Sequence, residues 1–209
     1  MTSATFGQRL FARWYPGFMA RVERAGQAQL RRTQLARARG RTLEIGAGNG
    51  LSVPHYPDDL PELVLLEPNP AMRDRLTESV GTPTAPVTIV DGDAHALEFP
   101  DASFDTVTAS LVFCSVRDPA LALSEVHRVL KPGGQFLFHE HVRGTGLRGC
   151  CQDLLTPLQR RLADGCHANR DFESLLATAD FDVETIDHTR MPTSASTIVP
   201  LVVGTARRR

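Results

Sequence analysis

The sequence LEIGAGNG at residues 43–50 decides the fold of this chain of 209 residues. A short strand-like run that contains the acidic Glu44 continues directly into three alternating glycines. Glycine permits backbone angles and clearances that a β-carbon would prevent, so such a turn lets a nucleoside lie against the main chain at the carboxyl end of a first strand. A dinucleotide fingerprint would place its third glycine at position 51, where this chain has Leu51. The stretch therefore predicts a nucleoside site of another kind.

A second apolar run follows at residues 63–66 and ends in the acid Glu67. At the end of a second strand, this carboxylate is placed to accept hydrogen bonds from both hydroxyls of a ribose. The alternative is a solvated glutamate on the surface.

Three further landmarks come after these two in the chain. They are the pair Asp93-Ala94, the segment SFDTV at 103–107 and the segment RVLKPGG at 128–134. Together with Glu44, its glycines and Glu67, they make residues 40–142 resemble the class I S-adenosylmethionine (SAM) methyltransferases. The resemblance implies that the cofactor is SAM, that the product is S-adenosylhomocysteine and that the substrate is a small molecule.

The spacing of apolar runs and turn residues predicts alternating strands and helices. Strands are expected at 42–46, 63–67, 87–90, 104–110 and 134–142, and helices at 70–79 and 118–130. An insertion at 145–169, a helix at 170–179 and two strands at 181–188 and 197–206 complete the chain. The expected fold class is α/β with a Rossmann-like doubly wound sheet, and the resemblance implies seven strands, mostly parallel with the last strand antiparallel.

The resemblance implies a cofactor site built by the loops at the strand ends. Its expected members are Glu44, Gly46, Ala47, Gly48, Glu67, Pro68, Asp93, Ala94 and Leu111. Glu44 sets the glycine loop or accepts from the methionyl ammonium. Asp93 accepts from the exocyclic amine of adenine, the alternative being an aspartate that only stabilises its turn.

Composition excludes several other functions. A formal net charge of -1 and the lack of an aromatic and basic recognition module disfavour nucleic acid as a partner. No apolar run approaches the ~20 residues that span a bilayer, and no signal-peptide pattern is present, so the expected location is the cytoplasm. The four cysteines lack C-x-x-C spacing, so reduced thiols and no metal site are expected.

Residues 1–41 carry nine arginines and one acid, together with a stripe of aromatic side chains. Spacings of three and four predict helix, with a break at Pro16-Gly17. One interpretation makes residues 1–40 a helical lid over a methyltransferase domain at 41–209, with Trp14 and Tyr15 near the donor methyl and the arginines facing outward. The other is an interfacial helix that makes peripheral contact with anionic lipid.

The second half of the chain narrows the resemblance. The segments 111–116, 140–142 and 164–166, with Arg170, are similar to the methyltransferase-like small-molecule thiol methyltransferases, which implies a thiol or sulfide as methyl acceptor. The expected catalytic residues are Glu140 and His141. The expected substrate-binding residues are Trp14, Tyr15, Phe113, Cys114, His139, Cys166 and Arg170.

Three alternatives stay open at this point. Either histidine, 139 or 141, can be a hydrogen-bonded structural imidazole. The same scaffold also carries O-, N- and C-methyltransferases of lipids, quinones and secondary metabolites. A chain that binds SAM or S-adenosylhomocysteine as a regulator without turnover would show the same cofactor motifs.

Overall fold

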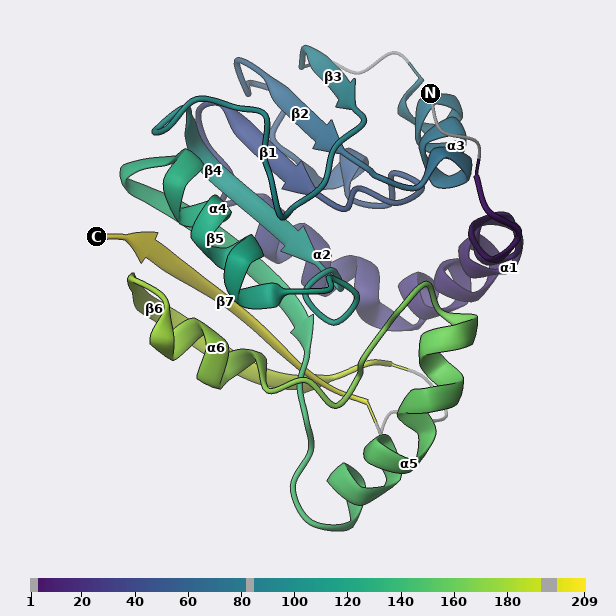
Figure 1. Ribbon diagram of the computed structural model, residues 1–209. Coiled ribbons are helices and arrows are strands. Elements are labelled where there is room, and N and C mark those ends of the chain that lie inside the picture. Colours follow the sequence, from purple (N-terminus) through teal and green to yellow (C-terminus); the bar gives the residue numbers. More distant parts are fainter. Residues whose placement is uncertain (1–3, 82–84, 193–198) are drawn as a thin grey trace.

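A single seven-stranded sheet organises the chain in the computed structural model, which describes residues 4–81, 85–192 and 199–209 (Figure 1). The strand order is β3-β2-β1-β4-β5-β7-β6. β1 to β5 pair in parallel, and β7 runs antiparallel to both of its neighbours. The strands are β1 (Thr42–Ile45), β2 (Leu63–Leu66), β3 (Val87–Val90), β4 (Phe104–Ser110), β5 (Leu130–His141), β6 (Phe181–Arg190) and β7 (Pro200–Arg208). The predicted mostly parallel sheet with an antiparallel last strand is confirmed.

Helices cover both faces of this sheet (Figure 1). α4 (Pro119–Val129) and α6 (Phe172–Thr178) lie on one face, where Phe136 and Phe138 of β5 are buried in the larger core cluster. α2 (Ala28–Leu35) and α3 (Pro70–Val80) lie on the other face with Leu137. The alternation along β5 therefore sends successive side chains into two separate cores, as a doubly wound sheet requires.

Two helices begin with a cap directly at the edge where the parallel strands end. Asn69 accepts from the backbone N–H of Ala71 at the start of α3, and Asp118 accepts from Leu121 at the start of α4. Each cap is followed by a proline, whose fixed φ and missing N–H suit the first helical position. These caps fix where the chain turns back from the sheet edge.

The expected break at Pro16-Gly17 is wrong. α1 (Phe6–Val22) passes through Pro16, and the helix changes direction at a π-helical segment, Glu23–Gln27, where Gly26 has a φ of 127°. Proline removes one hydrogen bond from the helix, but the next turn is held by burial of Met19 and Val22. Gly26 then adopts backbone angles that other residues rarely reach.

Three other elements differ in detail from expectation. The insertion contains a helix, α5 (Leu147–Leu162), and β5 begins four residues before the strand expected at 134–142. Residues 197–198 of the last expected strand lie outside the described residues. None of the described helices combines the length and apolar character that a membrane crossing needs.

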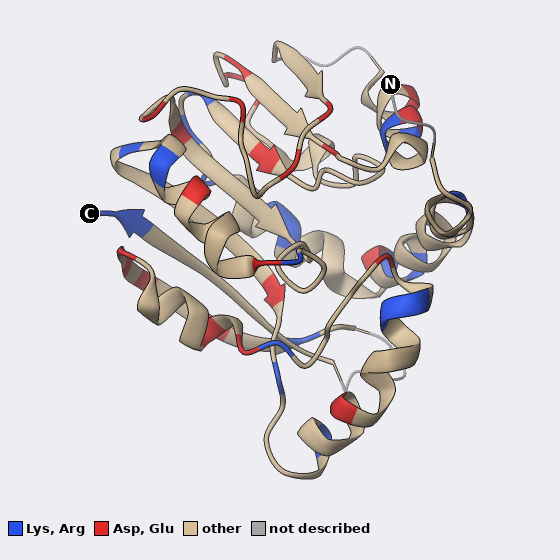
Figure 2. Cartoon of the chain, in the orientation of Figure 1, with Lys and Arg blue, Asp and Glu red and all other residues tan. Residues whose placement is uncertain are grey.

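Figure 2 shows basic side chains on the N-terminal helices and on α5, and also at the C-terminal end of β7. Not all of them face outward as expected. Arg31 of α2 is 5% exposed, donates to Ser52 Oγ at 2.9 Å and pairs with Glu23 at 3.1 Å. Arg31 thus joins the buried layer beneath the sheet, where its ion pair compensates its charge.

Candidate functional site

A cavity of about 440 Å³ lies at the carboxyl edge of the parallel strands. Its wall follows the order of the strands, from Asp93 after β3, through Glu67 after β2 and Gly46 after β1, to Leu111 after β4. The volume is in the range of about 300–1,000 Å³ that small-molecule sites occupy, and its position is the crevice where such sheets bind ligands.

The glycine turn after β1 brings bare backbone to this cavity. Gly46 and Gly48 have φ values of 65° and 59°, and a β-carbon on Gly46 would lie 2.7 Å from Cγ2 of Val112. Ala47 is buried beneath the turn, where its N–H donates to the Leu66 carbonyl at 3.0 Å. Gly46 and Gly48 therefore line the cavity, whereas Ala47 holds the turn against β2.

Glu67 connects this turn to the next strand. Its Oε2 accepts from the Gly48 N–H at 2.7 Å and its Oε1 accepts from the Asn69 N–H at 2.9 Å. Burial raises the pKa of the Glu67 carboxyl to about 7, although both N–H donors favour the ionised form. Each carboxylate oxygen retains a further lone pair for a ligand hydroxyl. Glu67 is thus a buried acceptor on the cavity wall, and the solvated alternative is excluded.

At the β3 end of the cavity, Asp93 and Ala94 form the wall together with His95. Burial opposes ionisation of Asp93, but hydrogen bonds from the backbone and ring of His95 outweigh it and hold the pKa of Asp93 below its ordinary value. The His95 Nε2 in turn accepts from the Asp118 N–H at 2.9 Å. Asp93 is therefore an ionised acceptor at the cavity, and it stabilises its turn as well.

The segment after β4 forms the wall next to α1. Leu111 has a φ of 61°, and its N–H donates to the His139 carbonyl at 2.8 Å. Among the described residues three non-glycines have positive φ, and two of them, Leu111 and Asp164, line the cavity. Strained backbone of this kind persists where the surrounding structure holds it, and it is common at functional sites.

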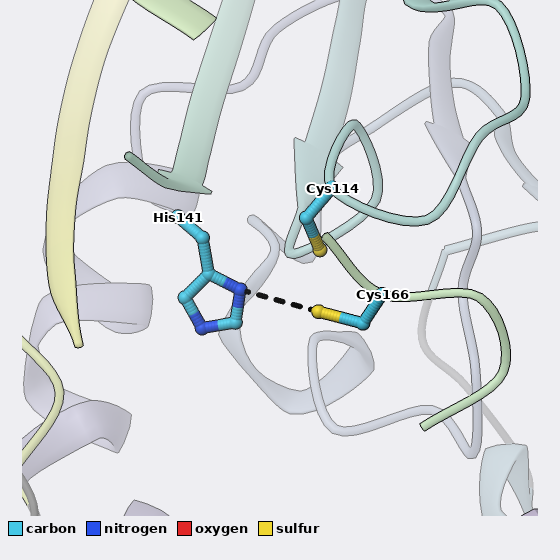
Figure 3. A group of neighbouring side chains, drawn as sticks. All are labelled: Cys114, His141 and Cys166. Atoms are coloured by element: carbon cyan, nitrogen blue, oxygen red, sulfur yellow. Dashed lines mark hydrogen bonds between the residues drawn. The ribbon is translucent and has the colours of Figure 1, made fainter. Parts of the chain in front are cut away.

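The two expected catalytic residues lie behind the cavity wall and do not line it. Glu140 is fully buried, and its Oε1 accepts from the Val112 N–H at 2.8 Å, so it positions the segment after β4. Burial raises the pKa of Glu140 to about 7. His141 points its Nδ1 at Sγ of Cys166, 3.8 Å away, with Cys114 beside them (Figure 3).

The structure places the expected substrate-binding residues in different environments. Tyr15 lines the cavity, whereas Trp14 is 37% exposed and packs edge-on against Phe11 and Phe18. Phe113 belongs to the core beneath α6.

The polar members of that set bind other parts of the chain. His139 Nε2 is 2.9 Å from the Gln27 amide, as its structural alternative predicts. Arg170 donates to the carbonyls of Phe113 and Val116. Cys114 and Cys166 form the group with His141.

Glu44 lies on the sheet face opposite the core of Phe136 and does not line the cavity. Burial raises its pKa to about 7, while the Ser52 and Tyr56 hydroxyls act against this rise. From the sequence, Glu44 is expected either to set the glycine loop or to accept from the methionyl ammonium. Its position fits the first role, through its contact with Ser52.

Sequence reasoning missed several residues of the wall, among them Gln8, Phe11, Asn69, Met72, His95, Ser110, Ser115, Val116, Arg117 and Asp164. The pair Asn69 and Asp164 is the most informative, because the Asn69 amide donates to the Asp164 carboxylate at 3.1 Å. Asn69 lies two residues after Glu67 and precedes Pro70 at the start of α3, a signal that could have found it. Asp164 is 95 residues away in the chain, and only the fold brings it to the site.

Comparison with known proteins agrees with this geometry. A family model described as a methyltransferase domain matches residues 43–138. A protein from Rattus norvegicus, thiol S-methyltransferase TMT1B, is 32% identical over 78% of this chain and 69% of its own length. The chain belongs to the class I SAM-dependent methyltransferases. A phosphatidylethanolamine N-methyltransferase from Cereibacter sphaeroides is 33% identical over 73% of this methyltransferase and 74% of its own length.

Solved structures show the same fold for this methyltransferase. One from Thermotoga maritima, described as a possible histamine N-methyltransferase, has a TM-score of 0.69 at 23% identity and covers 96% of this chain and 99% of its own. At this identity the likeness concerns the fold alone.

The cavity fits SAM, the cofactor of the family. Gly46 leaves space where a β-carbon would clash, and the carboxylates of Glu67 and Asp93 on the wall would accept from the ribose hydroxyls and the adenine amine of a bound SAM. SAM supplies a methyl group already activated on a positive sulfonium. The enzyme itself has to bind the cofactor, orient the acceptor and exclude water.

Proposed function

We propose that this enzyme methylates a small thiol or hydrogen sulfide. The observation that carries the proposal is the chemistry of the cavity wall between β4 and α1. This part consists of Gln8, Phe11, Tyr15, Ser110, Leu111, Val112, Ser115 and Val116. These described residues include no carboxylate, imidazole or amine, so this part of the wall offers no strong base to an acceptor bound against it.

A wall without a base favours an acceptor that ionises by itself. A cysteine-like thiol has a pKa of about 8.5, so a few per cent is thiolate at neutral pH, whereas an alcohol would need its proton removed in the site. Burial raises the pKa of Tyr15 above its ordinary value, so its hydroxyl stays protonated and can donate to an incoming sulfur. Tyr15 stacks on Phe11 with ring centroids 4.5 Å apart, which keeps the phenol in place.

The residues behind the wall support an in-line transfer by holding it still. Glu140 fixes Val112, and Arg170 fixes the carbonyls on either side of Cys114. α1 covers the cavity with Phe11 and Tyr15, which excludes water from the acceptor. The likeness to the rat thiol methyltransferase supports the same substrate class.

The principal alternative is N-, O- or C-methylation of a lipid, quinone or secondary metabolite. The likeness to the bacterial phosphatidylethanolamine N-methyltransferase favours the lipid among these. A regulator that binds the nucleoside without turnover is the alternative outside the enzymes.

Labelled SAM offered with sulfide, alkyl thiols, matched alcohols, phenols, quinols and phosphatidylethanolamine vesicles distinguishes these functions. We expect label in the sulfide and alkyl thiol products, and a rate that rises with pH as thiolate accumulates. Tyr15→Phe should slow the transfer, and Trp14→Phe, on the exposed side of α1, serves as the matched control. Transfer to the lipid amine or quinol alone would contradict the thiol proposal. Calorimetric binding of SAM without transfer to any acceptor would identify a regulator.

A further inference from the structure

A buried group of two thiols and an imidazole lies directly behind the cavity wall. Cys114, His141 and Cys166 are each less than a tenth exposed, and their sulfur and nitrogen atoms all lie within 4.8 Å of one another (Figure 3). Among the described residues, this is the one group of three Cys, His, Asp or Glu side chains close enough to hold an ion together. We infer that Cys114, His141 and Cys166 bind a thiophilic divalent cation, zinc first.

The spacing of the three atoms fits zinc. Bond lengths of about 2.3 Å to sulfur and 2.0–2.1 Å to nitrogen place tetrahedral ligands about 3.6 Å apart for S···N and about 3.8 Å apart for S···S. His141 Nδ1 lies 3.8 Å from Cys166 Sγ, close to the first of these values. The largest separation in the group, within 4.8 Å, has to shrink by at most about 1 Å, which side-chain rotation supplies. A disulfide would need the two sulfurs to approach to about 2.05 Å.

The three ligands come from three segments that other contacts already hold together. Cys114 follows β4, His141 ends β5, and Cys166 follows α5. The His167 N–H donates to the Cys114 carbonyl at 2.7 Å, and Arg170 donates to the carbonyls of Phe113 and Val116. The site is therefore preorganised, so a cation would not have to collect its ligands from mobile chain.

Polar groups lie beside both cysteines. The Gln159 amide donates to Cys166 Sγ at 3.5 Å, and the Arg170 guanidinium lies on the segment that carries Cys114. Binding releases one proton from each thiol to solvent, while His141 stays neutral and donates its Nδ1 lone pair. Two thiolates balance the two positive charges, so the buried site gains no net charge.

Three protein ligands leave the fourth corner of the tetrahedron for water or a solute. This pattern differs from closed structural zinc sites, which have four protein ligands. The linear sequence hides it, because Cys114 and Cys166 are 52 positions apart.

Metal content of the reduced enzyme, purified without a polyhistidine tag, tests the inference. We expect about one zinc per chain. Cobalt added to the zinc-free enzyme should give thiolate-to-cobalt absorption in the near ultraviolet and the strong visible bands of tetrahedral cobalt. Zinc addition should abolish both signals. This readout needs no variant and no methyl acceptor, so it does not depend on the proposed function.

Variants then assign the site. Loss of a residue that only hydrogen-bonds to a metal ligand weakens metal binding by about 10- to 100-fold. Cys114→Ser and Cys166→Ser each remove a ligand itself, so each should weaken zinc binding by more than that. Cys150→Ser and Cys151→Ser remove the exposed thiols of α5 and should leave the zinc content unchanged. Absence of both zinc and the cobalt spectrum in the reduced wild-type enzyme would overturn the inference. Zinc retained by folded Cys114→Ser and Cys166→Ser, or a disulfide between these cysteines in place of metal binding, would also overturn it.

Discussion

At the scale of single residues, the Glu67 carboxylate both holds the glycine turn and faces the cavity. Both of its oxygens already accept backbone N–H groups, which fixes the glycine turn, and the remaining lone pairs face the cavity. Glu67→Ala should weaken SAM binding by about 1.5–3 kcal/mol, the range for a hydrogen bond to a charged group. Calorimetric titration measures this, with Glu62→Ala, directly before the amino end of β2, as the control. Unchanged SAM affinity would remove Glu67 from the cofactor site.

The pH dependence of SAM binding provides a second test of Glu67. Only the carboxylate can accept from two hydroxyls at once, and burial raises the pKa of this group to about 7. SAM affinity should therefore fall by up to about tenfold per pH unit below 7. Stability without cofactor has the opposite sign, because a raised folded-state pKa favours the folded state most below the unfolded pKa of about 4.5, and this contribution is lost as pH rises through 7. Glu67→Gln should make both pH profiles flat. A wild-type SAM affinity that stays the same from pH 5.5 to 8 would contradict the prediction.

Sequence reasoning placed those residues correctly whose signal is local in the chain, and it misplaced those whose contacts come from distant segments. Gly46, Gly48 and Glu67 signal their roles through local backbone demands, and the structure places all three on the cavity. Glu140 and His141 lie behind the wall instead, because β5 directs their side chains to Val112 and to Cys166. Such pairings join distant segments and leave no pattern in the linear sequence.

At the scale of elements, α1 lines the cavity with one side and faces solvent with the other. Phe11 lines the cavity, while Leu10, one position earlier, is 45% exposed. Burying a phenylalanine contributes about 1.5–3 kcal/mol, and Phe11 is partly buried, so Phe11→Ala should lower kcat/KM by about fivefold to tenfold. Leu10→Ala on the same helix turn should leave turnover unchanged. Equal rates for both variants would show that α1 does not act as a cover.

Helix boundaries show which local signals are reliable. The Asn69-Pro70 and Asp118-Pro119 starts fit expectation because a cap and a proline act within one turn. The break expected at Pro16 failed because packing of Met19 against β7 and its neighbours outweighs one lost hydrogen bond. Local chemistry thus predicts where a helix begins better than it predicts where packing lets it continue.

At the scale of the whole molecule, arginines and exposed apolar side chains occur together on the surface formed by α1 and α5. α1 and α5 contact each other, and both present large apolar side chains to solvent. These are Phe6, Leu10, Trp14 and Phe18 on α1 and Leu147, Leu154, Leu155, Leu158 and Leu162 on α5. Both helices also carry arginines (Figure 2). Apolar side chains among basic ones are typical of a surface that lies on anionic lipid.

Vesicle sedimentation tests this peripheral contact. We expect the enzyme to bind vesicles containing phosphatidylserine more strongly than neutral vesicles, and to be released by salt, because each arginine near an anionic surface contributes about 1 kcal/mol that ions screen. Combined Phe6→Ser, Leu10→Ser and Phe18→Ser should reduce binding at least tenfold, since each removes apolar area from the lipid. Val183→Ser removes an exposed apolar side chain from β6, distant from this surface along the sheet, and should have no effect. Equal binding to neutral and anionic vesicles, or loss of binding in the Val183 variant alone, would show that the α1 and α5 surface does not face lipid.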